Sequence, residues 1–283
     1  MQILKGIQII DLALLIKDNL IIADTHIGYE EALNKQGILI PRFQFKEIIQ
    51  RLEATFKALA NNRSEGGWRT LSKNIKRKER LSSLKSKSSN NDKKINSNDN
   101  KKVDNDSNKK LFNKIIINGD IKHEFGIISE TEWRHTLQLL DFLKKYCNEV
   151  ILIKGNHDKI LGPIAKKRDV KVVDNYIIEN ILITHGNKIP EKLTKIKTII
   201  IAHEHPAISL KEGPRVELFK CFLKGKYKNK NLIVQPSFNL VQEGTDILKE
   251  KVLSPLLKQD LSNFKAYVVA DKVYNFGKIK KLR

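Results

Sequence analysis

Acidic, amide and imidazole side chains follow five apolar stretches of this sequence, each at its carboxyl end. The stretch LIIA is followed by Asp24 and His26, and VILI is followed, after Lys and Gly, by Asn156 and His157. The further members of this set are Asp120, His185, His203 and His205. These residue types can bind divalent metal ions and transfer protons.

The five apolar stretches are predicted to be strands of an α/β fold, and the carboxyl ends of such strands converge on one edge of a sheet. Each of these strand ends alone is weak evidence for a metal site, because a single buried histidine is more often a satisfied core residue than a ligand. Chance is a poor explanation for such residues at five strand ends, since each uncompensated buried polar group costs several kcal/mol. Imidazole and carboxylate together suit Mn, Fe, Zn or Co. Two such cations about 3.5–4 Å apart form a known type of phosphoryl-transfer site.

The elements that must position these residues can be predicted from apolar spacing. Apolar residues between Phe45 and Leu59 follow helical spacing, and the segment 114–118 (KIIIN) reads as a buried strand. Ser129 has Glu132 three residues on, which predicts a helix start of the capping-box type. Asp158 is expected to cap the short helix that follows it. Short strands after residue 150 complete a mixed α/β fold, with parallel units early and hairpins late.

Charge and composition divide the 283 residues into two kinds of sequence. Residues 63–110 are rich in Lys, Asn and Ser and are predicted to be a disordered insert, because they contain too few apolar residues to offset the entropy of ordering. Residues 1–62 and 111–283 are predicted to form a single domain. The insert contains fifteen Lys and Arg against six Asp and Glu, so the rest of the chain carries +12 of the total +21. A basic chain favours a nucleic-acid partner, and the alternative is a lysine-rich solvated surface.

Other features bear on location and assembly. No window approaches 18 unbroken apolar residues, and the N-terminus lacks the pattern of an export signal. Cys147 and Cys221 are too few for a disulfide framework and lack the paired spacing of a zinc site. A cytoplasmic protein without a membrane span is therefore expected. The sequence leaves the oligomeric state open, with a homodimer as one option.

The order Asp-x-His, Gly-Asp, Gly-Asn-His-Asp, His and His-x-His resembles the calcineurin-like metallophosphoesterase superfamily. The resemblance covers the chain from Leu20 to His205 around the insert, and Ala202 stands where the family usually has glycine. The stretches NGDIKHEFG, IPRFQ and VQPSFN are most similar to small archaeal phosphoesterases related to SbcD-type DNA nucleases. The resemblance implies a four-layer αββα sandwich of mixed sheets.

The same resemblance implies two divalent metal ions, with Mn foremost and Fe, Zn or Co as alternatives. Its ligands for the first metal correspond to Asp24, His26, Asp120 and His205. Its ligands for the second correspond to Asp120, Asn156, His185 and His203, with Asp120 bridging. His157 and His123 correspond to catalytic positions, and a histidine at position 123 that can be cationic would suit a phosphodiester.

These implications predict a phosphoesterase that cleaves phosphodiester bonds by attack of a metal-bound hydroxide. Nucleic acid is the expected substrate, which would make the protein a nuclease with a role in DNA repair. The alternatives are a phosphodiesterase or phosphomonoesterase of small molecules or nucleotides, and a metal-binding scaffold without turnover.

Overall fold

The computed structural model describes residues 1–63, 110–126 and 128–282, so the predicted insert lies outside the described residues except at its two ends. The chain divides into two compact units, one of Met1–Arg51 with Phe112–Arg283 and one of Leu52–Leu111. Both sheets and every residue of the predicted site belong to the first unit.

The first sheet contains seven strands in the order β1-β2-β3-β4-β5-β6-β7. Its first four strands pair antiparallel, and β4 to β7 pair parallel. The strands are β1 (Gln2–Leu4), β2 (Ile7–Ile10), β3 (Ala13–Ile16), β4 (Asn19–Ala23), β5 (Phe112–Asn118), β6 (Cys147–Ile153) and β7 (Lys171–Val173). The near-continuous apolar runs of β4, β5 and β6 are typical of parallel strands buried on both faces.

The second sheet has the strand order β14-β11-β12-β13-β10-β9-β8, and β15 and β16 extend it alongside β12. Strands β9, β10 and β13 are parallel, so they end on a common edge. The strands are β8 (Asn175–Ile178), β9 (Ile181–Thr184), β10 (Thr198–Ile201), β11 (Pro206–Glu212), β12 (Arg215–Tyr227), β13 (Lys230–Val234), β14 (Thr245–Asp246), β15 (Lys265–Val269) and β16 (Val273–Lys278).

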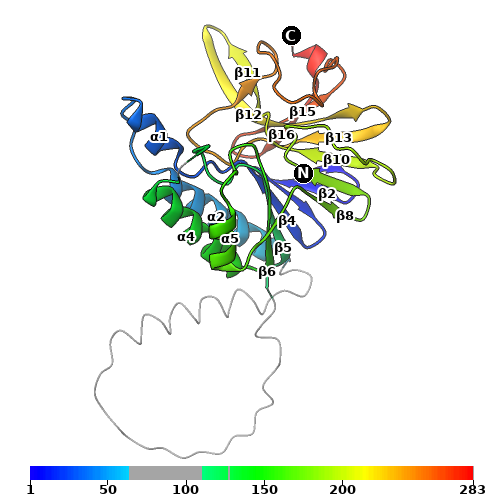
Figure 1. Ribbon diagram of the computed structural model, residues 1–283. Helices are drawn as coiled ribbons and strands as arrows, with labels where there is room; N and C mark the ends of the chain where they lie inside the picture. Colours follow the sequence, from blue (N-terminus) through cyan, green and yellow to red (C-terminus); the bar gives the residue numbers. More distant parts are fainter. Residues whose placement is uncertain (64–109, 127, 283) are drawn as a thin grey trace, which may run out of the picture. The chain divides into compact units, whose positions relative to one another are not determined.

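The described helices are few. They are α1 (Tyr29–Lys35), α2 (Gln44–Arg63), α4 (Glu130–Lys144), α5 (Gly162–Arg168) and the 3-10 turn η2 (Ile279–Lys281). Helices α4 and α5 lie against one another on one side of the first sheet, where α4 contacts β6 (Figure 1). Within the described segments, no helix is both long enough and apolar enough to cross a membrane.

Two predicted helix starts have different outcomes. Ser129 caps α4 as predicted, since its side chain accepts a hydrogen bond of 3.1 Å from the backbone nitrogen of Glu132. The expectation for Asp158 is wrong, because α5 begins only at Gly162, with Leu161 before it and Pro163 in the first turn. The carboxylate of Asp158 instead accepts hydrogen bonds from the backbone nitrogens of Gly155 and Ile121.

The predicted mixed α/β class with two sheets is confirmed. Buried side chains on one face of the second sheet pack with residues between 247 and 264 and with Ile279 of η2. Over that face, the described chain therefore supplies loop residues and one 3-10 turn where the αββα arrangement places helices.

Hydrogen bonds connect the two sheets close to the predicted site. The side chain of Gln235, directly after β13, donates to the carbonyl oxygens of Ile21 in β4 (2.9 Å) and of Leu12 between β2 and β3 (3.3 Å). The backbone nitrogens of Phe238 and Asn239 donate to the carbonyls of Ala23 and Asp24. The carboxyl ends of β4 and β13 are thereby held side by side.

Candidate metal centre

The loops that leave β4 and β5 run next to one another beyond the end of the sheet. His26 N donates to Asp120 O and Ile27 N to Ile121 O, each at 2.9 Å. These bonds continue the parallel pairing of the two strands past their last residues. They place the side chains of Asp24, His26 and Asp120 at the same edge of the sheet.

The predicted side chains from all five strand ends gather at this edge. Among the described residues, three groups have ligand atoms within 4.8 Å of one another: Asp24 with His26 and His205, Asp120 with His185 and His203, and His26 with His123 and His157. Asn156 joins the second group, because its Oδ1 lies 2.9 Å from Nε2 of His185. The first two groups follow the division implied by the family resemblance, and the role of each residue as a ligand remains a prediction.

The carboxylates of Asp24 and Asp120 lie among the imidazoles. Oδ2 of Asp24 is 3.2 Å from Nε2 of His205 and accepts a hydrogen bond of 2.9 Å from the backbone nitrogen of His203. Oδ2 of Asp120 is 3.3 Å from Nε2 of His185 and 3.8 Å from Nε2 of His26. Asp120 therefore faces both halves of the cluster.

Five residues of the cluster have left-handed backbone conformations. Their φ angles are 49° for Asp24, 42° for His26, 36° for Asp120, 64° for His203 and 49° for His205. Such conformations cost roughly 1–3 kcal/mol per non-glycine residue and occur where the surroundings enforce them, often at functional sites. The turns after β4, β5 and β10 thus hold side chains in directions that relaxed strands would not give.

Two glycines make room for the cluster. A Cβ atom on Gly119 would lie 1.9 Å from Nδ1 of His185, and one on Gly155 would lie 2.0 Å from Oδ1 of Asp120. Gly119 also has a φ of +83°, which favours glycine. Ala202, where the family usually has glycine, is buried, and its nitrogen donates to the carbonyl of His185 at 2.9 Å, so it extends the pairing of β10 with β9.

We expect Gly119→Ala to weaken metal binding, because the new methyl group must displace the ring of His185. Gly6→Ala is the matched control, since Gly6 has a φ of +80° but a methyl group added there would have nothing within 4 Å. Both variants should lose about 1–2 kcal/mol of stability from the left-handed backbone. Only Gly119→Ala should also lose affinity in a metal titration, and equal affinities would show that His185 does not hold a metal.

Burial and mutual contact shift the pKa values across the cluster. Burial, with help from His205, lowers the pKa of His26 to about 3. Burial alone would lower that of His185, but the carboxylates of Asp120 and Asp24 outweigh it and raise its pKa to about 9. Burial alone would raise the pKa of Asp120, but the histidines around it outweigh burial and hold that pKa below its usual range. The carboxylates are therefore anionic and the ring of His26 is neutral, whereas the ring of His185 must release a proton when it binds a metal.

The donor set fits divalent cations. Oδ1 of Asp24 and Nδ1 of His185 are buried 3.4 Å apart, and neither has a hydrogen-bond partner among the described residues. The two atoms form an ion pair without a hydrogen bond, and cations bound by their respective groups would compensate each of them. Together with the close approach that Gly119 and Gly155 allow to His185 and Asp120, these atoms suit imidazole and carboxylate ligation.

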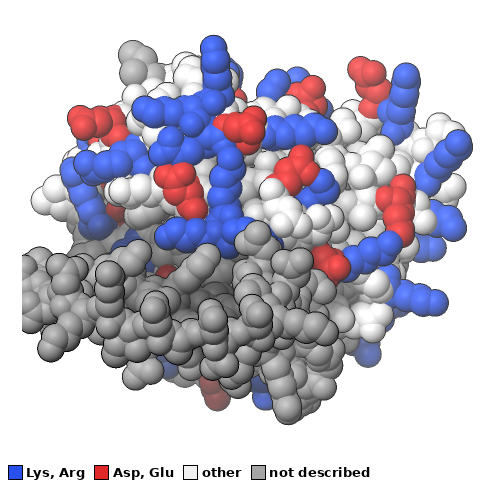
Figure 2. Space-filling model, turned by 90° about the horizontal axis from the view of Figure 1, so that it is seen from below, with Lys and Arg blue, Asp and Glu red and all other residues white. Residues whose placement is uncertain are grey.

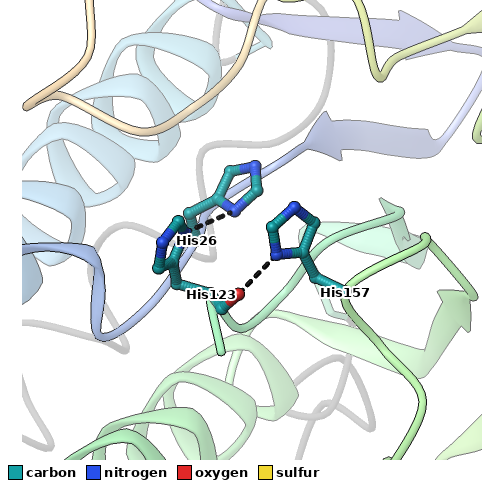
Figure 3. A group of neighbouring side chains, drawn as sticks. All are labelled: His26, His123 and His157. Atoms are coloured by element: carbon teal, nitrogen blue, oxygen red, sulfur yellow. Dashed lines mark hydrogen bonds between the residues drawn. The ribbon is translucent and has the colours of Figure 1, made fainter. Parts of the chain in front are cut away.

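His26, His123 and His157 form the third group, and their side chains lie next to one another (Figure 3). Nδ1 of His123 is 3.4 Å from Nδ1 of His26, and Nδ1 of His157 is hydrogen-bonded to the carbonyl of His123. Burial and the neighbouring His157 lower the pKa of His123 to about 4. Its ring is therefore neutral at pH 7, and the cationic contact expected of His123 is not supported.

Sequence reasoning missed two fully buried charges that hold this group. Oε1 of Glu132 accepts hydrogen bonds from the backbone nitrogens of His123 (2.8 Å) and Glu124 (2.9 Å). Nζ of Lys122 donates to the carbonyls of His157 (2.8 Å) and Glu124. The sequence indicated Glu132 only as part of a helix start, and its burial becomes visible only in the structure.

Two further buried side chains fix the backbone of candidate ligands. The side-chain nitrogen Nε2 of Gln44 donates to the backbone carbonyl oxygens of Thr25 and His26, each at 3.3 Å. Glu204, between His203 and His205, accepts hydrogen bonds from the backbone nitrogens at positions 253 and 254. Gln44 is the last residue of the stretch IPRFQ, which carried part of the family resemblance. That stretch therefore helps to hold the backbone of the candidate ligand His26.

Asp158 is buried beneath the cluster. Its Oδ2 accepts hydrogen bonds from the backbone nitrogens of Gly155 (3.0 Å) and Ile121 (3.4 Å), and its Oδ1 has no partner among the described residues. Burial, reinforced by Asp120, raises its pKa to about 7. The carboxyl joins two loops of the site and is half protonated near neutral pH.

We expect Asp158→Asn to stabilise the metal-free protein at pH 8 and to stabilise it less at pH 5. A carboxyl whose folded pKa lies above its unfolded value of 3.8 costs nothing below pH 3.8 and costs progressively more as pH rises to about 7. The neutral amide removes a cost of about 2–4 kcal/mol at pH 8. Thermal unfolding in chelator at both pH values measures the difference. A destabilisation at pH 8 would show that the ionised carboxylate is needed.

The fold and the site together define a class: a hydrolase of mixed α/β fold in which two sheets bring acidic and imidazole ligands to one edge. The family model described as calcineurin-like phosphoesterase matches residues 20–234. The chain therefore belongs to the calcineurin-like phosphoesterase family, a family of metal-dependent hydrolases of phosphoric esters with a site for two divalent ions. This confirms the predicted superfamily and enzyme class.

Comparison with solved structures finds the same fold in one nuclease and weaker similarity in other proteins. The crystal structure of Pseudomonas putida nuclease MPE is 17% identical, with a TM-score of 0.55, over 95% of this chain and 93% of that one. The protein of unknown function AQ665 from Aquifex aeolicus is 18% identical, with a TM-score of 0.32, over 66% and 78%. Zinc-bound Vps29 from Entamoeba histolytica is 15% identical, with a TM-score of 0.26, over 59% and 82%. A search of curated protein sequences finds no significant match.

Proposed function

We propose that the protein is a nuclease, a phosphoesterase that hydrolyses phosphodiester bonds of nucleic acid. The observation that carries the choice of substrate is the net charge of +21, of which +12 lies outside residues 63–110. Figure 2 shows Lys and Arg side chains gathered on one face, with Asp and Glu side chains between them. A basic surface attracts the phosphate backbone without regard to sequence. The Pseudomonas putida protein of the same fold is described as a nuclease, and the proposal extends that activity to this chain.

The candidate ligands would hold the two cations: Asp24, His26, Asp120, Asn156, His185, His203 and His205. Bound cations would neutralise phosphate oxygens and lower the pKa of a water molecule that attacks phosphorus. Manganese is the proposed metal, with Fe, Zn or Co as alternatives that the same imidazole and carboxylate ligation suits. We also propose a cytoplasmic location and a role in DNA repair, which follow from the proposed substrate and from the sequence features already described.

His157 is the proposed proton donor to the leaving oxygen. Its backbone nitrogen donates to Oδ1 of Asp120 at 2.9 Å, and its Nδ1 is held by the carbonyl of His123. Nε2, 4.0 Å from Oδ2 of Asp120, is therefore the atom that would carry the transferred proton. The proposed role of His123 is to position the rings of His26 and His157, since it contacts both.

A cavity next to the site is the observation that favours small-molecule phosphodiester or monoester substrates. It has a volume of about 210 Å³, and its lining includes Ile27, Gln44, Arg42 and Arg134. Pockets for small ligands typically have about 300–1,000 Å³. The cavity is smaller than that range, so nucleic acid bound across the surface remains the preferred substrate.

An assay of the purified, manganese-loaded chain separates the candidates. Cleavage of single-stranded or duplex DNA, with a rate that falls as salt rises, would support the nuclease. Hydrolysis of bis-p-nitrophenyl phosphate without DNA cleavage would favour small substrates. Metal binding without either activity would favour a scaffold.

A further inference from the structure

An exposed aromatic ring stands at the edge of the candidate site. Phe125 is 49% exposed, and its ring centroid lies 3.7 Å from that of His157, with 31° between the ring planes. Nε2 of His157 in turn lies 4.0 Å from Oδ2 of Asp120. One imidazole therefore separates this ring from a carboxylate that is a predicted metal ligand.

Two buried charged side chains hydrogen-bond to the backbone just before Phe125. Lys122 and Glu132, both 0% exposed, bond to the backbone at His123, Glu124 and His157. Burying charged groups is costly unless they are paired or hydrogen-bonded, so these contacts hold the backbone directly before Phe125. The ring of Phe125 thus follows directly after a hydrogen-bonded stretch of backbone.

A cation lies beside the same ring. Nζ of Lys159 is 6.0 Å from the ring centroid of Phe125, and Lys159 is exposed. An aromatic face next to a positive charge is the combination that proteins use for single-stranded nucleic acid, where a base stacks on the ring and the charge meets the backbone.

From these contacts we propose that Phe125 is a stacking platform for an unpaired base next to the scissile phosphate. Lys159 contacts the adjoining phosphate. Since bases within a duplex are already stacked on their neighbours, the platform makes single-stranded nucleic acid the preferred substrate. This inference rests on the proposed nuclease function and names its substrate class.

Binding without cleavage tests the proposal. Fluorescence anisotropy in chelator compares a labelled oligothymidylate with an abasic oligonucleotide of the same length and charge. The wild-type chain should bind the oligothymidylate more tightly. Phe125→Leu keeps an apolar side chain but removes the ring, and it should weaken that binding by about 5- to 100-fold while leaving the abasic oligonucleotide unaffected. Phe125→Trp should retain the preference for bases.

Tyr274→Leu is the matched control, because Tyr274 is also an exposed ring beside a lysine, 5.2 Å from Nζ of Lys272. It should bind both oligonucleotides as the wild type does. Equal losses in the two leucine variants, or an equal loss of Phe125→Leu on the abasic oligonucleotide, would overturn the proposal. Tight wild-type binding without a preference for bases would overturn it and leave the nuclease proposal standing. Failure of the wild type to bind either oligonucleotide would overturn both.

Discussion

Asp120→Asn is expected to abolish turnover and to reduce metal binding more than any other single substitution. The carboxylate of Asp120 lies within 4 Å of nitrogen atoms on His26 and His185, which belong to the two predicted metal groups. A bridging position needs a full negative charge to hold two cations close together, and an amide supplies none. The loss of affinity should exceed the 10- to 100-fold that is typical for groups that only support ligands.

Metal analysis and turnover on a phosphodiester measure this effect. Asp158→Asn is the matched control, since it makes the same chemical change in a buried carboxylate that contacts Gly155 and Ile121. The control should keep two ions per chain and most of its activity. Two bound ions and near-normal rates in Asp120→Asn would contradict the bridging role.

The second large effect is expected for His157→Ala, which should keep both ions and lose about 10²- to 10⁴-fold in rate on substrates with poor leaving groups. Its Nδ1 is engaged by His123, so Nε2 is the atom that can deliver a proton to the leaving oxygen. The loss should shrink for p-nitrophenyl esters, whose leaving group departs without protonation. Charge stabilisation alone would slow both kinds of substrate equally.

Metal content decides how the His157 result is interpreted. His157 shares a possible metal-binding group with His26 and His123, so a variant with only one ion would show that His157 is a ligand. His135→Ala serves as a control, because the ring of His135 stacks on that of Phe45, with 4.3 Å between the ring centroids. In the described structure it contacts no predicted ligand. It should retain the wild-type rate on both substrates.

The sequence by itself determined the strands of the site and which residues would meet. Apolar runs such as that of β5, followed by a glycine and an acid, are local patterns, and parallel pairing brings their ends to one edge. The cap at Ser129 is local in the same sense, since donor and acceptor are three residues apart. The helical spacing that begins at Phe45 also matches α2.

Only the tertiary structure decided what surrounds these residues. Asp158 accepts hydrogen bonds from two loop nitrogens instead of capping a helix. Glu132 accepts hydrogen bonds from residues eight and nine positions earlier in the chain. His123 loses its expected charge because burial and His157, 34 residues away, act on its ring. Hydrogen bonding and desolvation depend on neighbours that folding brings from distant segments, and a local pattern of residue types does not specify them.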